Sequence, residues 1–174
     1  MVTKMKNKLL NRWFGQNQTV SSSGVNLRTG LSVLIADDSR TQLFALEKML
    51  QAEGVKTHTA ENGKQAILMA RHVQPDLILM DIVMPEINGF QATRYLSRQD
   101  DTGHIPIIII SGSNQQSDKT WGLKLGASDY MDKPVERNLL LKKISYWTAE
   151  VGGDKSPSTP AKKKAQHKAW VEAV

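Results

Sequence analysis

The chain has 174 residues, of which 40% are hydrophobic and 23% charged, a composition typical of one globular domain and not of a disordered or fibrous chain. Its formal net charge is +6 and it contains no cysteine, so a disulfide framework, a thiolate metal site and a cysteine nucleophile are excluded. No apolar run approaches the roughly 20 residues that span a bilayer, and residues 1–14 lack the apolar stretch of a signal peptide, so we expect a cytoplasmic protein.

The first 30 residues are a basic segment. They contain five Lys or Arg residues and no acidic residue, and residues 16–30 are rich in Ser, Asn, Gly and Thr, so we expect a flexible extension over residues 1–30. A short helix within it would have apolar and basic sides, as in helices that bind a membrane surface or a partner protein. The apolar residues are Met5, Leu9, Leu10, Trp13 and Phe14, and the basic ones are Lys4, Lys8 and Arg12. A frayed tail is the alternative, because a helix of this length is unstable alone.

Residues 31–150 alternate between strand-like and helix-like segments. The predicted strands are Leu31–Ala36, Val55–Ala60, Asp76–Met80, Ile105–Ile110 and Ser128–Met131. The predicted helices are Ser39–Glu53, Gly63–Val73, Phe90–Gln99, Asp118–Lys124 and Glu136–Glu150. Three of the strands are continuously aliphatic, which is typical of strands covered on both faces of a parallel sheet. The order predicts a doubly wound α/β domain of five βα units, over residues 31–150.

Single residues mark several of the predicted helix ends. Ser39 stands at the start of the first helix, where serine is a favoured N-cap. Gly54, Gly103 and Gly126 stand where the first, third and fourth helices are expected to stop, because glycine readily adopts the backbone angles of a helix C-terminus.

Polar residues follow the predicted strands. Asp37 and Asp38 come after the first strand, Asp81 after the third, Ser111 after the fourth and Lys133 after the fifth. In a doubly wound sheet the ligand crevice lies at the carboxyl ends of the strands, so we expect these side chains to converge. Three close carboxylates repel one another unless a cation lies among them, and an all-oxygen ligand set suits Mg²⁺. Beside Mg²⁺, a carboxylate oxygen can attack phosphorus while an ammonium and a hydroxyl hold the other phosphoryl oxygens.

Four motifs around these residues resemble the CheY-like receiver domains of bacterial two-component response regulators. They are I-A-D-D-S at 35–39, L-I-L-M-D-I-V-M-P-E-I-N-G at 77–89, I-I-I-S-G at 108–112 and D-Y-M-D-K-P-V at 129–135. The resemblance covers about residues 31–150. It implies a flavodoxin-like parallel sheet with the strand order 2-1-3-4-5.

The resemblance also implies a role for each site residue. Asp81 would be the phosphoacceptor and also a ligand of Mg²⁺. Asp37 and Asp38 would hold the ion directly or through water, and the backbone carbonyl of Val83 would complete the protein ligands. Lys133 would pair with the phosphate. Ser111 would be the hydroxyl that moves towards the phosphate, and Tyr130 would be the aromatic residue that changes rotamer in response.

Other interpretations of these residues remain. Asp37, Asp38 and Ser39 could merely cap the following helix. Asp81 fits capping poorly, because Pro85 prevents a helix from continuing through the loop after it. An aspartyl-nucleophile phosphatase would have D-x-D after the first strand, and a dinucleotide-binding domain would have G-x-G-x-x-G there, whereas this chain has A-D-D-S-R-T.

The fourth predicted helix is expected to shift on phosphorylation. It is short, and Gly122 in its interior costs about 1 kcal/mol relative to alanine. We hypothesise that Ser111 moves onto the phosphoryl group and that Tyr130 swings inward. The surface around Trp121, Lys124 and the last helix would then be remodelled for a partner. The alternative is that Trp121 packs as an ordinary apolar anchor.

Residues 151–174 contain five lysines against two acidic residues and are too few to build an independent core. We expect a flexible Lys-rich tail and no DNA-binding domain. Its lysines could touch nucleic acid only non-specifically.

Two stretches narrow the resemblance, M-D-I-V-M-P-E-I-N-G-F-Q-A-T-R at 80–94 and D-K-T-W-G-L-K-L-G-A-S-D-Y-M-D-K-P-V at 118–135. Within the receivers they look most like the single-domain regulators of chemotaxis-type systems that control type IV pili and twitching motility, the PilH type. This implies a CheA-like histidine kinase or phosphotransfer protein as donor and the pilus machinery as a downstream target. Such a protein catalyses only its own phosphorylation and dephosphorylation and is otherwise not an enzyme. Three modes of action stay open: binding a target when phosphorylated, draining phosphate from a shared kinase, and acting as an adaptor tethered to membrane or nucleic acid by the basic ends.

Overall fold

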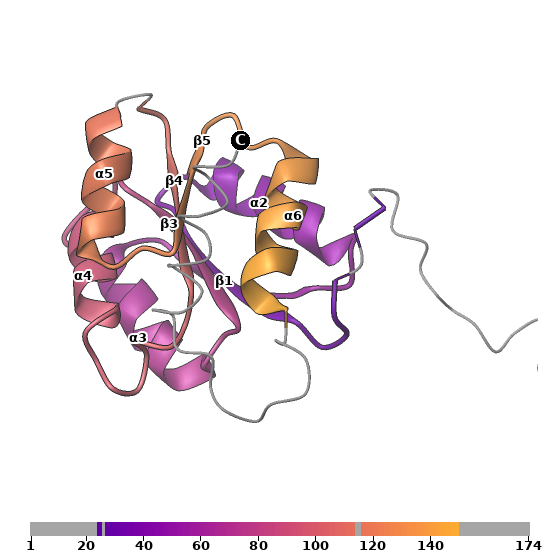
Figure 1. Cartoon of the computed structure of the whole chain (residues 1–174), viewed down its shortest axis with the longest axis horizontal. Helices are drawn as coiled ribbons and strands as arrows, with labels where there is room; N and C mark the ends of the chain where they lie inside the picture. The colour runs from indigo at the N-terminus through magenta and orange to yellow at the C-terminus, as the bar shows by residue number, and fades with distance from the viewer. Residues whose placement is uncertain (1–23, 26, 114–115, 150–174) are drawn as a thin grey trace, which may run out of the picture.

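The computed structural model describes residues 24–25, 27–113 and 116–149. In this part of the chain, five parallel strands form one sheet in the order β2-β1-β3-β4-β5 (Figure 1). The strands are β1 (Ser32–Ala36), β2 (Lys56–Ala60), β3 (Leu77–Asp81), β4 (Ile107–Ser111) and β5 (Asp129–Asp132). The helices are α2 (Arg40–Gln51), α3 (Gly63–Val73), α4 (Gly89–Leu96), α5 (Gln116–Leu125) and α6 (Arg137–Thr148). The predicted doubly wound α/β fold and its strand order are confirmed.

The aliphatic strands supply the core on both faces of the sheet. In β1, Val33 and Ile35 belong to the cluster under α2 and α6, whereas Leu34 belongs to the cluster under α3 and α4. The same alternation occurs in β3 and β4, so consecutive aliphatic residues are all buried. Figure 1 shows α2 and α6 on one side of the sheet and α3, α4 and α5 on the other. The continuous aliphatic runs therefore follow from a sheet that helices cover on both faces.

The glycines predicted to end helices differ in what they do. Gly54 and Gly126 have φ angles of 76° and 115°, the left-handed conformation expected after a helix. The prediction for Gly103 is wrong, because α4 already ends at Leu96 and Gly103 lies in the following turns. There its backbone N–H donates to the carbonyl of Gln99 at 2.7 Å. The helix stops earlier because the Thr102 hydroxyl binds the Leu96 carbonyl at 2.9 Å and holds the chain in turns.

The packed part of the chain begins before Leu31, where the sequence placed the domain boundary. Val25 and Leu27 pack against the core cluster beneath α2 and α6. Arg28 forms an ion pair with Asp76, the residue before β3. Residues 1–23 of the predicted extension and the whole predicted tail, residues 151–174, lie outside the described residues. Among the helices that are described, none is long and apolar enough to cross a membrane.

Gly89 allows the start of α4 to approach the end of β3. A Cβ on Gly89 would lie 1.9 Å from the backbone carbonyl oxygen of Asp81. We therefore expect Gly89→Ala to lower the free energy of unfolding by about 3 kcal/mol, since the clash is with backbone that cannot move aside cheaply. Urea denaturation measures this loss. Gly112→Ala is the matched control, because a Cβ there meets no atom within 4 Å, and an equal loss in both variants would contradict the explanation.

Candidate functional site

Three carboxylates gather at the carboxyl edge of the sheet. Asp37 directly follows β1, and Asp81 is the last residue of β3. The two strands are neighbours in which Ala36 pairs with Met80, so the next residue on each strand is brought side by side. Each of Asp37, Asp38 and Asp81 has an oxygen within 4.8 Å of the others. Asp37 and Asp81 are buried and Asp38 is exposed, so the cluster is open to solvent on one side.

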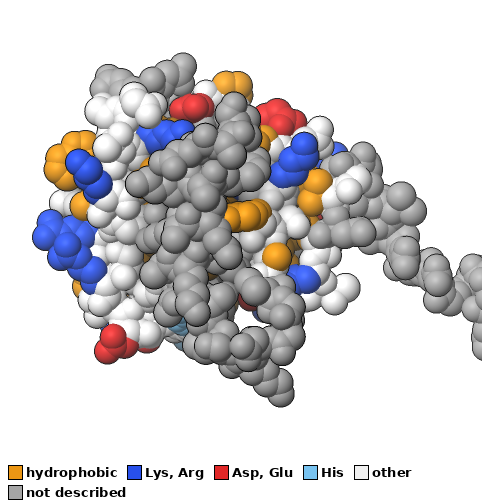
Figure 2. Space-filling view, in the orientation of Figure 1, with side chains coloured by type: hydrophobic (Ala, Val, Ile, Leu, Met, Phe, Trp, Pro, Cys, Tyr) orange, Lys and Arg blue, Asp and Glu red, His pale blue; other side chains and the backbone are white. Residues whose placement is uncertain are grey.

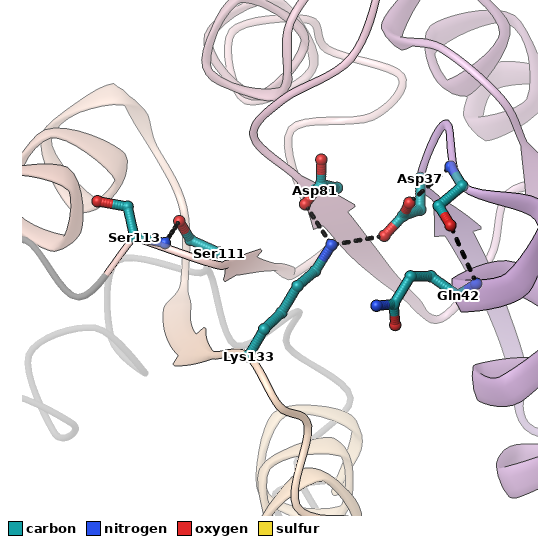
Figure 3. A network of polar contacts seen from close by, with 7 residues as sticks. Asp37, Gln42, Asp81, Ser111, Ser113 and Lys133 are labelled. Carbon is teal, nitrogen blue, oxygen red and sulfur yellow. Dashed lines mark hydrogen bonds and ion pairs between the residues drawn. The ribbon is translucent and has the colours of Figure 1, made fainter.

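Lys133 bridges the two buried carboxylates. Its Nζ lies 2.8 Å from Oδ2 of Asp37 and 2.7 Å from Oδ1 of Asp81 (Figure 3). Its backbone N–H donates to the Ser111 carbonyl at 2.7 Å, which holds the start of the β5–α6 loop against the end of β4. The side chain therefore reaches past β4 to the carboxylates after β1 and β3. The structure brings together all four charged residues that the sequence assigned to the site.

Ser39, and not the aspartates, caps the following helix. The hydroxyl oxygen of Ser39 accepts the backbone N–H of Gln42 in the first turn of α2. The Asp37 carboxylate accepts the backbone N–H of Ser39 at 2.8 Å with its other oxygen. Asp37 is thus held by one backbone donor and by the Lys133 ammonium, and its oxygens face the site.

Burial and charge act in opposite directions on the ionisation of the site. Burial raises the pKa of Asp81 above its usual value and the nearby Asp37 charge adds to this, while Lys133 and the backbone N–H of Val83 lower it. For Lys133, burial lowers the pKa, but hydrogen bonds to Asp37 and Asp81 outweigh it and the net pKa is raised. Lys133 therefore stays charged, and the pKa of Asp81 remains raised chiefly because the carboxyl group is buried.

The donor set fits a hard divalent cation. The cluster offers carboxylate oxygens from Asp37, Asp38 and Asp81, with Asp38 on the solvent side where water ligands have access. Oxygen ligands with retained waters are what Mg²⁺ prefers. Burial is the largest cause of the raised pKa of Asp81 and the nearby Asp37 charge adds to it, so a cation beside Asp81 would favour its ionised form. The side chain of Val83 points to solvent and is 76% exposed, so only its backbone can contribute to the site.

Ser111 and Tyr130 are linked through a loop residue that the sequence did not single out. Ser111 is buried at the end of β4, and its hydroxyl oxygen accepts the backbone N–H of Ser113 at 3.0 Å. The Tyr130 hydroxyl donates to the Ser113 carbonyl at 3.0 Å, and burial raises the pKa of Tyr130, so this hydroxyl remains a donor. The sequence did not indicate a role for Ser113, because S-G-S after a strand is typical of many polar loops.

Two expectations about the switch region need correction. The hypothesis that Tyr130 swings inward assumed an outward ring, but the ring is already buried, with 6% of its surface exposed. Trp121 is 58% exposed, so it is not the packed anchor of the alternative interpretation. Gly122 does more than weaken α5, because a Cβ there would lie 2.6 Å from Cδ1 of Ile109 in β4. The glycine lets α5 lie close against the sheet.

Comparison with known proteins agrees with this geometry. The family model described as "Response regulator receiver domain" matches residues 33–145. The chain belongs to this family. The receiver thus contains the whole strand-end cluster, from Asp37 to Lys133, inside the matched region.

Relatives of this receiver occur both as short and as long proteins. Protein PilH of Pseudomonas aeruginosa is 48% identical over 113 residues, which are 65% of this chain and 93% of PilH. Response regulator PleD of Caulobacter vibrioides is 36% identical over 67% of this chain, which spans 26% of PleD. A solved receiver domain of the P. aeruginosa sensor histidine kinase PA1611 has a TM-score of 0.66 and 30% identity, covering 70% of this chain and 100% of that one. That structure is described with a magnesium ion coordinated in its active-site cleft.

Proposed function

We propose that this receiver accepts a phosphoryl group on Asp81 from a CheA-like histidine kinase or its phosphotransfer protein, in a Mg²⁺-dependent reaction. The observation that carries the proposal is the bridge of Lys133 between Asp81 and Asp37 within a cluster of three carboxylates. The likeness to PilH supports a role in type IV pilus or chemotaxis-type control. Histidine kinases depend on ATP, so the proposal places the protein in the cytoplasm.

Each residue of the site has its own role in the proposed phosphoryl transfer. An ionised oxygen of Asp81 attacks phosphorus, the phosphorus–nitrogen bond of the donor phosphohistidine breaks, and its electron pair stays on the imidazole. Lys133 exchanges a carboxylate contact for an oxygen of the incoming phosphoryl group, which its ammonium stabilises electrostatically. Asp37 and Asp38, with the Val83 carbonyl, would hold Mg²⁺, which supplies charge neutralisation between carboxylate and phosphoryl oxygens.

The contacts of Ser111 support a route from the site to α5. The Ser111 hydroxyl oxygen accepts the hydrogen bond of Ser113 N–H, so a movement of Ser111 towards the phosphoryl group would weaken that bond. Ser113 is also held by Tyr130, so the loop before α5 and the Tyr130 hydroxyl would move together. The close contact of Gly122 with Ile109 then transmits the change to the position of α5.

The exposed surface of α5 favours direct binding of a target over simple removal of phosphate. Trp121 of α5 is 58% exposed, and large exposed aromatic side chains commonly belong to binding surfaces. Figure 2 shows hydrophobic and basic side chains together along the margin formed by α4 and α5. A target protein that binds only the phosphorylated receiver would contact this surface.

We expect the emission of Trp121 to change when beryllofluoride and Mg²⁺ are added, because the start of α5 is displaced. The chain has four tryptophans, so the measurement compares the intact protein with Trp121→Phe. The change should be present in the first and absent in the second. An unchanged spectrum in the intact protein, under conditions where the mimic binds, would contradict a movement of α5.

Phosphotransfer from candidate kinases tests the proposed function itself. Transfer to the intact protein should need Mg²⁺ and should be absent in Asp81→Asn. Capture of a non-kinase protein only in the presence of the phosphoryl mimic would support direct signalling. Rapid transfer and turnover without such capture would instead support the role of a phosphate sink for a shared kinase.

A further inference from the structure

Helix α5 packs on the sheet without a large buried side chain. Of its ten residues, all of which the structure describes, Gly122 is the one that is buried. A Cβ on Gly122 would lie 2.6 Å from Cδ1 of Ile109 in β4 and 3.6 Å from Cε1 of Phe90 in α4. The contact is therefore made by helix backbone lying against two apolar side chains. A helix held in this way has few buried apolar contacts to lose, so its movement costs little free energy.

The carboxyl-terminal end of α5 is tied to α4, which lies beside it (Figure 1). The hydroxyl of Ser97, the residue after α4, donates to the carbonyl of Leu125, the last residue of α5, at 2.9 Å. The Arg94 carbonyl within α4 lies farther from the same hydroxyl, at 3.3 Å. Gly126 follows with a φ of 115°, and a Cβ on it would lie 2.4 Å from Cβ of Ser97. Glycine adopts this φ readily and leaves room for the serine side chain.

From this end the chain continues directly into the sheet. The backbone N–H of Ala127 donates to the Gly122 carbonyl at 3.0 Å. The backbone N–H of Ser128 donates to the carbonyl of Ile107, the first residue of β4, at 2.8 Å. Ala127 and Ser128 are both buried. The carboxyl-terminal end of α5 therefore has fixed neighbours on α4 and on β4.

The amino-terminal end of α5 follows the loop that begins at Ser111. Ser113 in this loop donates its backbone N–H to the Ser111 hydroxyl oxygen and accepts the Tyr130 hydroxyl, both at 3.0 Å. The helix begins three residues later, at Gln116. The movement proposed for Ser111 would alter both contacts of Ser113. The two ends of α5 therefore differ, because one is tied to α4 and the other follows a loop that is expected to move.

We propose that phosphorylation of Asp81 turns α5 about its carboxyl-terminal end, with the contact between Ser97 and Leu125 as the pivot. The inference rests on the proposed phosphorylation and adds which part of the helix moves. A movement of Ser111 displaces the chain before α5, while Ser97 keeps Leu125 in place and the Gly122 backbone slides over its apolar neighbours. Ser97 is then a positioning residue, since it acts on the response through α5.

A turn about this point grades the displacement along the helix. Gln116 lies nine residues from Leu125, about 13 Å along the axis, and Lys124 lies one residue from it, about 1.5 Å. For the same tilt, Gln116 therefore moves roughly nine times as far as Lys124. Trp121 lies between them, so its surroundings change while the end of α5 beside α4 stays in place.

Distances between pairs of spin labels test the movement. The chain has no cysteine, so labels can be attached at chosen positions. One label is at Ala45→Cys on α2 or at Lys56→Cys on β2, and the other is at Gln116→Cys or Lys124→Cys, all of them exposed positions. With beryllofluoride and Mg²⁺ bound, we expect the distances to position 116 to change and those to position 124 to change severalfold less. Equal changes, a larger change at position 124 or unchanged distances would each overturn the proposal.

Replacing Ser97 with alanine tests the pivot in the free protein as well. The Leu125 carbonyl loses its hydroxyl donor, so we expect the distribution of distances to position 124 to broaden without any mimic. With the mimic bound, the changes at positions 116 and 124 should become similar. Ser145→Ala, which removes another half-buried hydroxyl, on α6, is the matched control and should leave both distributions as in the intact protein. An unbroadened distribution in Ser97→Ala would refute the pivot.

Phosphoryl uptake separates failure of the pivot from failure of the proposed function. Ser97→Ala should take up a phosphoryl group from acetyl phosphate at the rate of the intact protein, as measured by mass, because Ser97 is not among the residues of the site. Normal uptake without graded distance changes would refute the pivot and leave the proposed function intact. No uptake by the intact protein would overturn the proposed function and, with it, the response of α5.

Discussion

Replacing Lys133 with methionine is expected to lower the rate constant for phosphorylation of Asp81 by about 10²–10³-fold, the usual cost of removing one preorganised donor from a site of developing charge. The ammonium lies 2.7 Å from Asp81 and 2.8 Å from Asp37, so it is already in place to meet a phosphoryl oxygen. Methionine has a similar length and lacks the charge. Single-turnover transfer from acetyl phosphate or a phosphorylated donor measures the loss.

The pKa of Asp81 in the Lys133→Met variant distinguishes loss of the ammonium charge from loss of folding. Lys133 lowers the pKa of Asp81 against the larger effect of burial, so its removal should raise that pKa further. Carbon-13 NMR of the Asp81 carboxyl group, titrated without Mg²⁺, measures the shift. A pKa that stays unchanged or falls, in a variant that remains folded, would mean that Lys133 does not act on Asp81.

Replacing Asp129 with alanine is expected to lower the free energy of unfolding by roughly 3 kcal/mol, the low end of the range for breaking a buried ion pair. Asp129 is 4% exposed and accepts hydrogen bonds from Lys143, from the Trp147 indole and from the Tyr130 backbone. Its loss leaves the Lys143 ammonium largely buried without this carboxylate. The estimate stays at the low end because the Lys143 side chain is 18% exposed and keeps some water.

Two control variants test whether the loss of stability in Asp129→Ala comes from the buried ion pair. Asp101→Ala removes a carboxylate that binds Arg71 at the same distance of 2.8 Å, but both side chains are about half exposed, so little change is expected. The double variant Asp129→Leu with Lys143→Met replaces the pair by apolar groups and should recover much of the lost stability. Urea denaturation compares all four proteins. A loss in Asp129→Ala no larger than that in Asp101→Ala would show that the buried network does not stabilise α6.

The fold was largely predictable because continuously aliphatic strands indicate burial on both faces of a sheet. Every residue of a run such as Ile107–Ile110 belongs to one of the three core clusters, which only a sheet covered on both faces allows. The site residues were predictable for the related reason that polar residues directly after such runs must lie at one edge. The ends of the elements were less certain, as at Gly103, because turn hydrogen bonds of Thr102 compete with helix continuation.

The remaining features depend on contacts between distant segments. In the sequence, Asp129 is one more polar residue beside Tyr130, and nothing local shows that Lys143 and Trp147 come back to it from α6. The packing of Val25 and Leu27 was missed for a similar reason, since they are two apolar residues in a polar stretch. The exposure of Trp121 also could not be inferred, because its helix contacts the sheet through Gly122 instead.

Locating the phosphorylated residue tests most directly whether Asp81 is the phosphoacceptor. Purified protein is incubated with acetyl phosphate and Mg²⁺, the acyl phosphate is trapped by borohydride reduction, and peptide mass spectrometry locates the modified residue. We expect one modified position, Asp81, and no modification when Mg²⁺ is chelated or when Asp81 is replaced by asparagine. Modification at another residue, or uptake that persists in Asp81→Asn, would contradict it.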